Sequence, residues 1–135
     1  MADIGWVVDT APLVAYVEGN LVSLGREARR VIRQVEAGRA RLGVPTVCLF
    51  EIGQLEERGR IRLRKPFEQW CDLVEQAPGL AICPLGRAEV SEARALPTLR
   101  DPFDRLIAGT AIALGVPLIS ADARIAGAGR VRTVW

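Results

Sequence analysis

Histidine is absent from this sequence of 135 residues. Its absence excludes Ser-His-Asp and Cys-His catalysis, histidine metal ligands and imidazole general bases in one step. Any hydrolytic chemistry in this chain must therefore rest on carboxylates, hydroxyls, arginine or a metal ion.

Cysteines and long hydrophobic runs are both scarce. The chain has three cysteines, Cys48, Cys71 and Cys83, which lie in apolar stretches. They are odd in number and lack the paired spacing of zinc sites or disulfide frameworks, which indicates a reducing, cytoplasmic compartment. The longest nearly apolar stretch, residues 106–121, is interrupted by Gly, Thr, Pro and Ser, and no basic segment leads an apolar one at the N-terminus. We therefore expect neither secretion nor membrane insertion.

Lysine occurs once, at Lys65, so seventeen of the eighteen basic residues are arginine, while the net charge is only +2. Arginine suits phosphate and carboxylate partners, although a GC-rich genome would produce the same bias. Half of the residues are hydrophobic and no low-complexity segment occurs, which predicts a single domain over residues 1–135.

Short apolar runs bounded by turn residues alternate with longer amphipathic stretches, a pattern typical of βα units around a parallel sheet. The predicted strands are residues 4–8, 41–44, 80–83, 116–120 and 131–135. The predicted helices are residues 11–17, 24–37, 46–58, 66–76, 87–95 and 101–114, with Thr46 and Asp101 as N-caps and Gly115 beyond the last helix. Right-handed crossovers would place helices on both faces of about five parallel strands.

Two acidic residues follow predicted strands, where ligands bind in open parallel sheets. Asp9 closes the run IGWVV, and Asp122 follows LISA. Each is equally typical of a turn or helix cap. Ser120 either adds a hydroxyl to a phosphate or metal-bound water, or is an ordinary strand-end serine.

Two further acids lie on the packed faces of predicted helices. Glu51 interrupts VPTVCLFEIGQL at the edge of an apolar stripe, where a carboxylate is costly to desolvate unless a cation or hydrogen bonds receive it. Asp104 stands one turn before Ile107 in a helix that must pack against the sheet. The alternatives are a Glu51 that reaches solvent and an Asp104 that complements the helix dipole.

If these four acids converge, their mutual repulsion requires a divalent cation. Because the available donors are oxygens, Mg²⁺ or Mn²⁺ fits better than Zn²⁺. Such sites serve phosphate-ester chemistry.

Four segments together resemble the PIN-domain family, particularly VapC-like toxins: VVDTAPLVAY, the Glu51 of CLFEIGQL, RDPFDRLIAGTAIALGVPLISAD and the terminal VRTVW. The resemblance implies a three-layer α/β/α sandwich and Mg²⁺- or Mn²⁺-dependent endoribonuclease activity on structured RNA. It also implies inhibition by a cognate antitoxin and assembly as a homodimer. The implied catalytic acids are Asp9, Glu51, Asp104 and Asp122, of which Asp9, Asp104 and Asp122 would hold the metal.

The sequence departs from the family pattern near these acids. Ala11 stands where relatives often carry a polar residue, and Asp122 is followed by Ala-Arg with no second acid nearby. We therefore expect one tightly held ion, with another recruited together with the RNA phosphate. Because there are fewer acids near Asp122 than the family pattern has, a second interpretation stays open. In it the protein is a catalytically weak or inactive module that binds RNA or the antitoxin. Ala11 and the lone lysine argue against dehalogenase-like and receiver-like phosphoryl chemistry.

Several other residues are candidates for accessory roles. Thr10, Ser120 and Arg105 are expected to contact substrate or support the acids. Arg100, Arg105 or Arg124 would clamp a phosphate or neutralise the cluster. The basic run RGRIRLRK, residues 58–65, would bind an RNA backbone or the antitoxin, or would simply be a solvated loop.

Overall fold

The computed structural model describes residues 2–135, which form one sheet of five parallel strands in the order β3-β2-β1-β4-β5. The strands are β1 (Ile4–Val8), β2 (Arg41–Pro45), β3 (Leu80–Cys83), β4 (Leu118–Ile119) and β5 (Thr133–Val134). Two of the strands are therefore much shorter than the sequence predicted.

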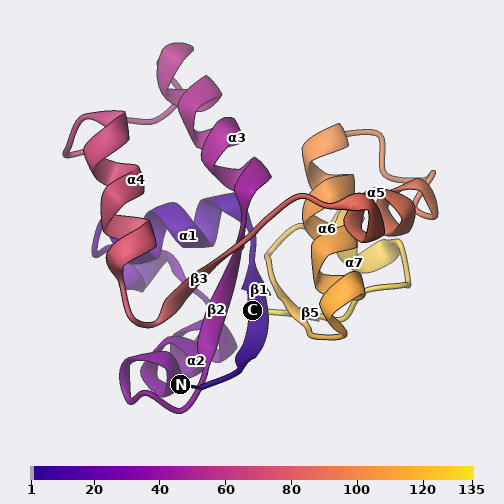
Figure 1. Ribbon diagram of the computed structural model, residues 1–135, viewed down its shortest axis with the longest axis horizontal. Helices are drawn as coiled ribbons and strands as arrows, with labels where there is room; N and C mark the ends of the chain where they lie inside the picture. Colours follow the sequence, from indigo (N-terminus) through magenta and orange to yellow (C-terminus); the bar gives the residue numbers. More distant parts are fainter. Residues whose placement is uncertain (1) are drawn as a thin grey trace.

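Helices cover both faces of this sheet, as Figure 1 shows. The helices α1 to α4 lie on one side of the strands, and α5 to α7 lie on the other. Their bounds are α1 (Thr10–Val17), α2 (Arg26–Glu36), α3 (Thr46–Glu57), α4 (Phe67–Gln76), α5 (Arg87–Arg94), α6 (Pro102–Leu114) and α7 (Ala123–Gly127), with a 3₁₀ turn η1 (Leu21–Ser23). The predicted three-layer α/β/α sandwich with a central parallel sheet is confirmed. Within residues 2–135, no helix has the length and apolar character needed to cross a membrane.

The order of the strands creates a crevice between β1 and β4. From β1 the chain adds β2 and β3 on one side, and it then returns to place β4 and β5 on the other side. Val8 is paired with Ile119, so the residues that follow these two strands lie beside each other at the carboxyl edge of the sheet. In open α/β sheets this reversal of strand order is where ligands bind.

The hydrophobic core lies on both sides of the central strands. Val7, Leu42 and Leu118 from the sheet are fully buried, as are Ile107 of α6 and Trp70 of α4. Each such side chain contributes about 1.5–3 kcal/mol through burial of its apolar surface. The rigid core fixes the sheet edge on which the candidate acids stand.

The local structure differs from the predictions at the start of α3 and in the last two strands. The prediction of Thr46 as an N-cap was wrong: Pro45 precedes the helix, and the Thr46 hydroxyl instead donates to the Cys83 carbonyl at 3.1 Å. β4 begins only after Pro117, which has no N–H for the sheet ladder. β5 is correspondingly short because its sheet partner is β4. Sequence reasoning also missed η1 and α7.

The close packing of α5 against α6 depends on Gly109. A Cβ atom added at this residue would lie 2.7 Å from the Glu89 carbonyl oxygen and 2.9 Å from the Ala93 nitrogen, both of them backbone atoms of α5. Backbone atoms cannot rotate away as a flexible side chain can. Gly109 thus sets the distance between the two helices on this face of the sheet.

We expect Gly109→Ala to lower the free energy of unfolding by about 1–3 kcal/mol, because the added methyl group overpacks the α5–α6 contact. Gly127→Ala is the matched control, since a Cβ there would meet nothing within 4 Å. Urea unfolding of the two variants and the parent protein measures both effects. A Gly109→Ala protein as stable as the Gly127→Ala protein would contradict this view of the packing.

Candidate active site

A cavity of about 460 Å³ opens at the carboxyl edge of the sheet, in the crevice between β1 and β4. All four acids singled out in the sequence line it, although they come from distant parts of the chain. Its polar lining includes Asp9, Thr10, Asn20, Ser23, Glu51, Asp101, Asp104, Asp122 and Arg124. In Figure 1 this edge is where β1 and β2 end and where α1, α3 and α6 begin.

Asp9 stands at the centre of this arrangement. It follows β1 and caps α1, and its Oδ1 accepts the Thr10 backbone N–H at 2.8 Å. Its Oδ2 accepts the Ser120 hydroxyl at 2.7 Å, and the Ser120 oxygen in turn accepts the Asp122 N–H at 3.1 Å. Ser120 is only 2% exposed, so it serves to join Asp9 to the Asp122 segment across the crevice.

Glu51 is joined to the same group through Thr10. The Thr10 hydroxyl donates a hydrogen bond to Glu51 Oε1, which connects the first turn of α1 to the middle of α3. Burial raises the pKa of Glu51, the Thr10 bond opposes this rise, and the negative charge of Asp9 adds to it. Thr10 and Ser120 therefore hold carboxylates in place, and both are buried.

Asp104 is the acid whose environment most opposes ionisation. Its side chain is 14% exposed. Burial raises the pKa of Asp104 to about 7, with further contributions from the charges of Asp101, Asp9 and Asp122. Asp101 caps α6, as the sequence predicted, by accepting the Asp104 N–H at 3.1 Å, and it also lines the cavity.

Asp122 has the opposite electrostatic environment because Arg124 lies against it. The Arg124 guanidinium donates to both Asp122 oxygens, at 3.2 and 3.0 Å, and these hydrogen bonds lower the pKa of Asp122. The same guanidinium lies 3.9 Å from Asp104. An exposed arginine thus partly neutralises two of the acids. The Asp122 side chain also accepts the Arg124 backbone N–H, so it caps α7.

Arg105 is placed elsewhere. Its guanidinium donates to the carbonyl oxygens of Ala93 at 3.0 Å and Arg94 at 3.3 Å, at the end of α5, and it does not line the cavity. A long side chain one residue after Asp104 points to a different face of α6, which its position in the sequence alone does not reveal. Arg124 is the arginine that contacts the predicted acids.

The donor set of the cavity suits a hard divalent cation. Carboxylate and hydroxyl oxygens are the ligands of Mg²⁺ and Mn²⁺. A cation would offset the burial and the repulsion that together raise the pKa of Asp104. As they stand, no three His, Cys, Asp or Glu side chains within residues 2–135 form a ready metal-binding group. Arg124 lies between Asp104 and Asp122, so it would have to leave these carboxylates for a cation to bind them both.

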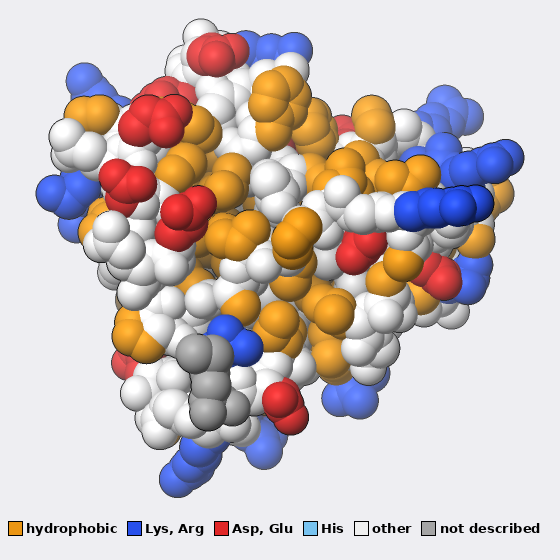
Figure 2. All heavy atoms as spheres, in the orientation of Figure 1, with side chains coloured by type: hydrophobic (Ala, Val, Ile, Leu, Met, Phe, Trp, Pro, Cys, Tyr) orange, Lys and Arg blue, Asp and Glu red, His pale blue; other side chains and the backbone are white. Residues whose placement is uncertain are grey.

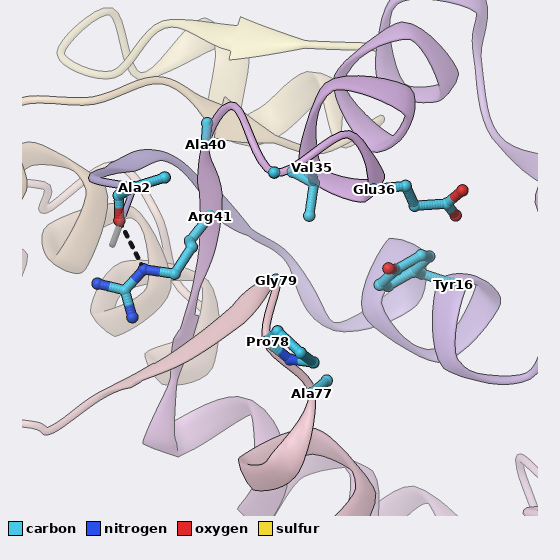
Figure 3. A pocket seen from close by; sticks show the side chains of 10 residues that line it. Ala2, Tyr16, Val35, Glu36, Ala40, Arg41, Ala77, Pro78 and Gly79 are labelled. Carbon is cyan, nitrogen blue, oxygen red and sulfur yellow. Dashed lines mark hydrogen bonds between the residues drawn. The ribbon is translucent and has the colours of Figure 1, made fainter.

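A second cavity, of about 310 Å³, lies at the opposite edge of the sheet, where the strands begin (Figure 3). Arg41 donates to the Ala2 carbonyl there at 2.7 Å, and Tyr16 lies beside Glu36. Burial raises the pKa of Tyr16, and Glu36 raises it further. Among the described residues that line this cavity, Glu36 is the single acid, so they offer no group of carboxylates comparable to the first cavity.

The chain is similar to known proteins in both sequence and structure. A family model described as the PIN domain matches residues 6–131. Ribonuclease VapC22 of Mycobacterium tuberculosis is 36% identical over 99 residues, which cover 70% of this chain and 74% of that protein.

Solved structures show the same fold at lower sequence identity. VapBC2 from Rickettsia felis, bound to a DNA fragment from its promoter, matches with a TM-score of 0.70 at 13% identity, over 97% of this chain and 98% of that chain. A toxin-antitoxin complex from Klebsiella pneumoniae matches with a TM-score of 0.63 at 18% identity, over 97% of each chain. The resemblance noted in the sequence is confirmed, and the chain belongs to the PIN-domain family.

Proposed function

We propose that this protein is a metal-dependent endoribonuclease and the toxin of a toxin-antitoxin pair. The observation that carries the proposal is the convergence of Asp9, Glu51, Asp104 and Asp122 on one cavity at the β1–β4 crevice. The chain has no histidine, so carboxylates are the main catalytic groups that it can offer for hydrolysis. The similarity to a curated ribonuclease supports RNA as the substrate.

In the proposed mechanism, Asp9, Asp104 and Asp122 would hold Mg²⁺ or Mn²⁺ once Arg124 has moved away from Asp104 and Asp122. When bound, the ion supplies charge stabilisation to the phosphoryl group and acidifies a water molecule. Asp9 keeps its orientation through the bonds to Thr10 and Ser120. Glu51, held by the Thr10 hydroxyl, would orient the attacking water and accept its proton, because burial raises its pKa. The scissile P–O bond breaks as the water oxygen binds phosphorus, and the leaving ribose oxygen takes a proton from solvent. Arg124 transfers its ion pair from Asp122 to a phosphate of the substrate.

The proposed partners are an antitoxin and a second copy of the chain. The similarity to a toxin-antitoxin complex supports the antitoxin. Figure 2 shows hydrophobic side chains gathered in the middle of the face that carries β3. Over the described surface as a whole, the large hydrophobic side chains with at least 42% of their surface exposed are Val22, Phe50, Leu73, Leu85, Val90 and Leu114. Exposed apolar patches of this kind mark interfaces.

Sedimentation equilibrium tests the homodimer. We expect a mass twice that of the 14.7 kDa chain, because association would remove this apolar surface from water. A single species with the mass of one chain over a wide range of protein concentrations would contradict the homodimer.

The catalytic proposal is tested by Asp104→Asn, which keeps the shape of the side chain and removes its charge. We expect cleavage of RNA with Mn²⁺ to fall roughly 100-fold or more, because the variant loses a ligand and the charge that the cation stabilises. Asp72→Asn, an exposed change of the same kind on α4, should cleave like the parent protein.

Gel analysis of a defined RNA, with Mn²⁺ and with EDTA, provides the measurement. Equal cleavage by the Asp104→Asn and parent proteins, or full cleavage in EDTA, would overturn the proposed mechanism. If no protein cleaves any RNA and the parent still binds it, the PIN fold serves here as a catalytically inactive binding module, with Arg124 as the permanent partner of Asp122.

A further inference from the structure

The acidic cavity adjoins a third cavity, which is lined by two arginines. This neighbouring cavity has a volume of about 730 Å³, and both are lined by Val14, Ala15 and Asn20. Because three residues line both cavities, the two lie next to each other along the second half of α1, and we refer to them together as one groove. The acids lie at one end of this groove, and Arg62 and Arg64 lie at the other end.

The basic end is formed by residues 58–65, the segment between α3 and α4. Ile61 and Leu63 are partly buried against the hydrophobic core, whereas Arg60, Arg62 and Arg64 are exposed. This alternation holds the segment down by its apolar side chains and presents its arginines outward. Its backbone is also fixed to α1, because the Arg64 N–H donates to a Glu18 carboxylate oxygen at 3.0 Å. The basic segment is therefore held in place by its apolar side chains, which pack on the core, and by a backbone hydrogen bond to Glu18.

Within residues 2–135, the arginines of this segment form no salt bridge with an acid. Residues 58–65 contain five basic residues and no acid. The salt bridges found in residues 2–135 involve Arg30, Arg124 and Arg130, and none involves residues 58–65. Glu18, the acid in this cavity, accepts the backbone N–H of Arg64. The guanidinium groups of Arg62 and Arg64 are thus available to an anion from outside the chain.

We propose that this groove binds the RNA strand that flanks the cleaved bond, with Arg62 and Arg64 binding its phosphates. The inference rests on the proposed ribonuclease function and identifies how the substrate is held. With a divalent cation at the acidic end, both ends of the groove attract the regularly charged phosphate backbone. A peptide in this groove would need basic residues facing the acids and acidic residues facing Arg62 and Arg64. The charges therefore favour a nucleic acid over a peptide.

The test compares the double variant Arg62→Gln/Arg64→Gln with the control Arg29→Gln/Arg33→Gln. The control removes the same charge from exposed residues of α2 that are outside this groove and form no salt bridge within residues 2–135. Fluorescence anisotropy with a labelled single-stranded RNA, measured at several salt concentrations, gives the affinity and its salt dependence. Thermal unfolding checks that each variant is folded.

We expect the Arg62/Arg64 double variant to bind this RNA roughly tenfold more weakly, with a salt slope smaller by about 1.4 because two phosphate contacts are lost. The control should bind like the parent protein. Equal affinity and slope for the two double variants, or no RNA binding by the parent, would overturn the inference. So would an unchanged RNA affinity combined with weaker binding of the antitoxin, because the groove would then be a protein site.

The binding measurement is independent of cleavage, so failure of either proposal can be distinguished. If Asp104→Asn abolishes cleavage while the Arg62/Arg64 variant binds RNA normally, the ribonuclease function is supported and RNA binding in the groove is contradicted. If the Arg62/Arg64 variant loses affinity for RNA and the parent protein cleaves no RNA, RNA binding in the groove is supported and the ribonuclease function is contradicted.

Discussion

The site depends on one constraint: its carboxylates are gathered at a half-buried sheet edge, where burial and mutual repulsion both oppose ionisation. Asp9, Asp104 and Asp122 share the end of one parallel sheet. Burial, followed by the charges of Asp101, Asp9 and Asp122, raises the pKa of Asp104 to about 7. A protein can relieve such repulsion by binding protons, by forming an ion pair or by binding a cation. Arg124 supplies the ion pair in this structure, and its side chain is exposed to solvent. In the proposed mechanism, Asp9, Asp104 and Asp122 would instead be neutralised by a bound divalent cation.

The elements around the site hold these carboxylates in place. The pairing of Val8 with Ile119 brings the ends of β1 and β4 together, so that Ser120 can donate to Asp9. The two bonds that Asp9 accepts from Ser120 and Thr10 partly offset the desolvation that raises its pKa. On the other face of the sheet, Gly109 allows α5 and α6 to approach closely, which fixes the helix that carries Asp104.

The sequence predicts those features that depend on local pattern. The buried run IGWVV identifies β1, and Pro102 and Gly115 delimit α6, with Gly115 adopting the left-handed conformation (φ 69°) typical of a helix end. Features that depend on long-range contacts could not be predicted in this way. The bond from Thr46 to Cys83 and the orientation of Arg105 toward α5 join segments far apart in the chain. The adjacency of the acidic cavity and the arginine-lined cavity likewise requires the folded arrangement of α1 against residues 58–65.

The most direct test of the account is calorimetric titration of the protein with Mn²⁺ in buffers of different ionisation enthalpy. Because the pKa of Asp104 is raised to about 7, part of the metal-free protein carries a proton there at that pH, and a bound cation must displace it. We predict binding that releases protons at about pH 7 and releases fewer as the pH rises, since Asp104 is then already ionised. Absence of Mn²⁺ binding, or binding with no proton release at about pH 7, would contradict the claim that these carboxylates form a metal site.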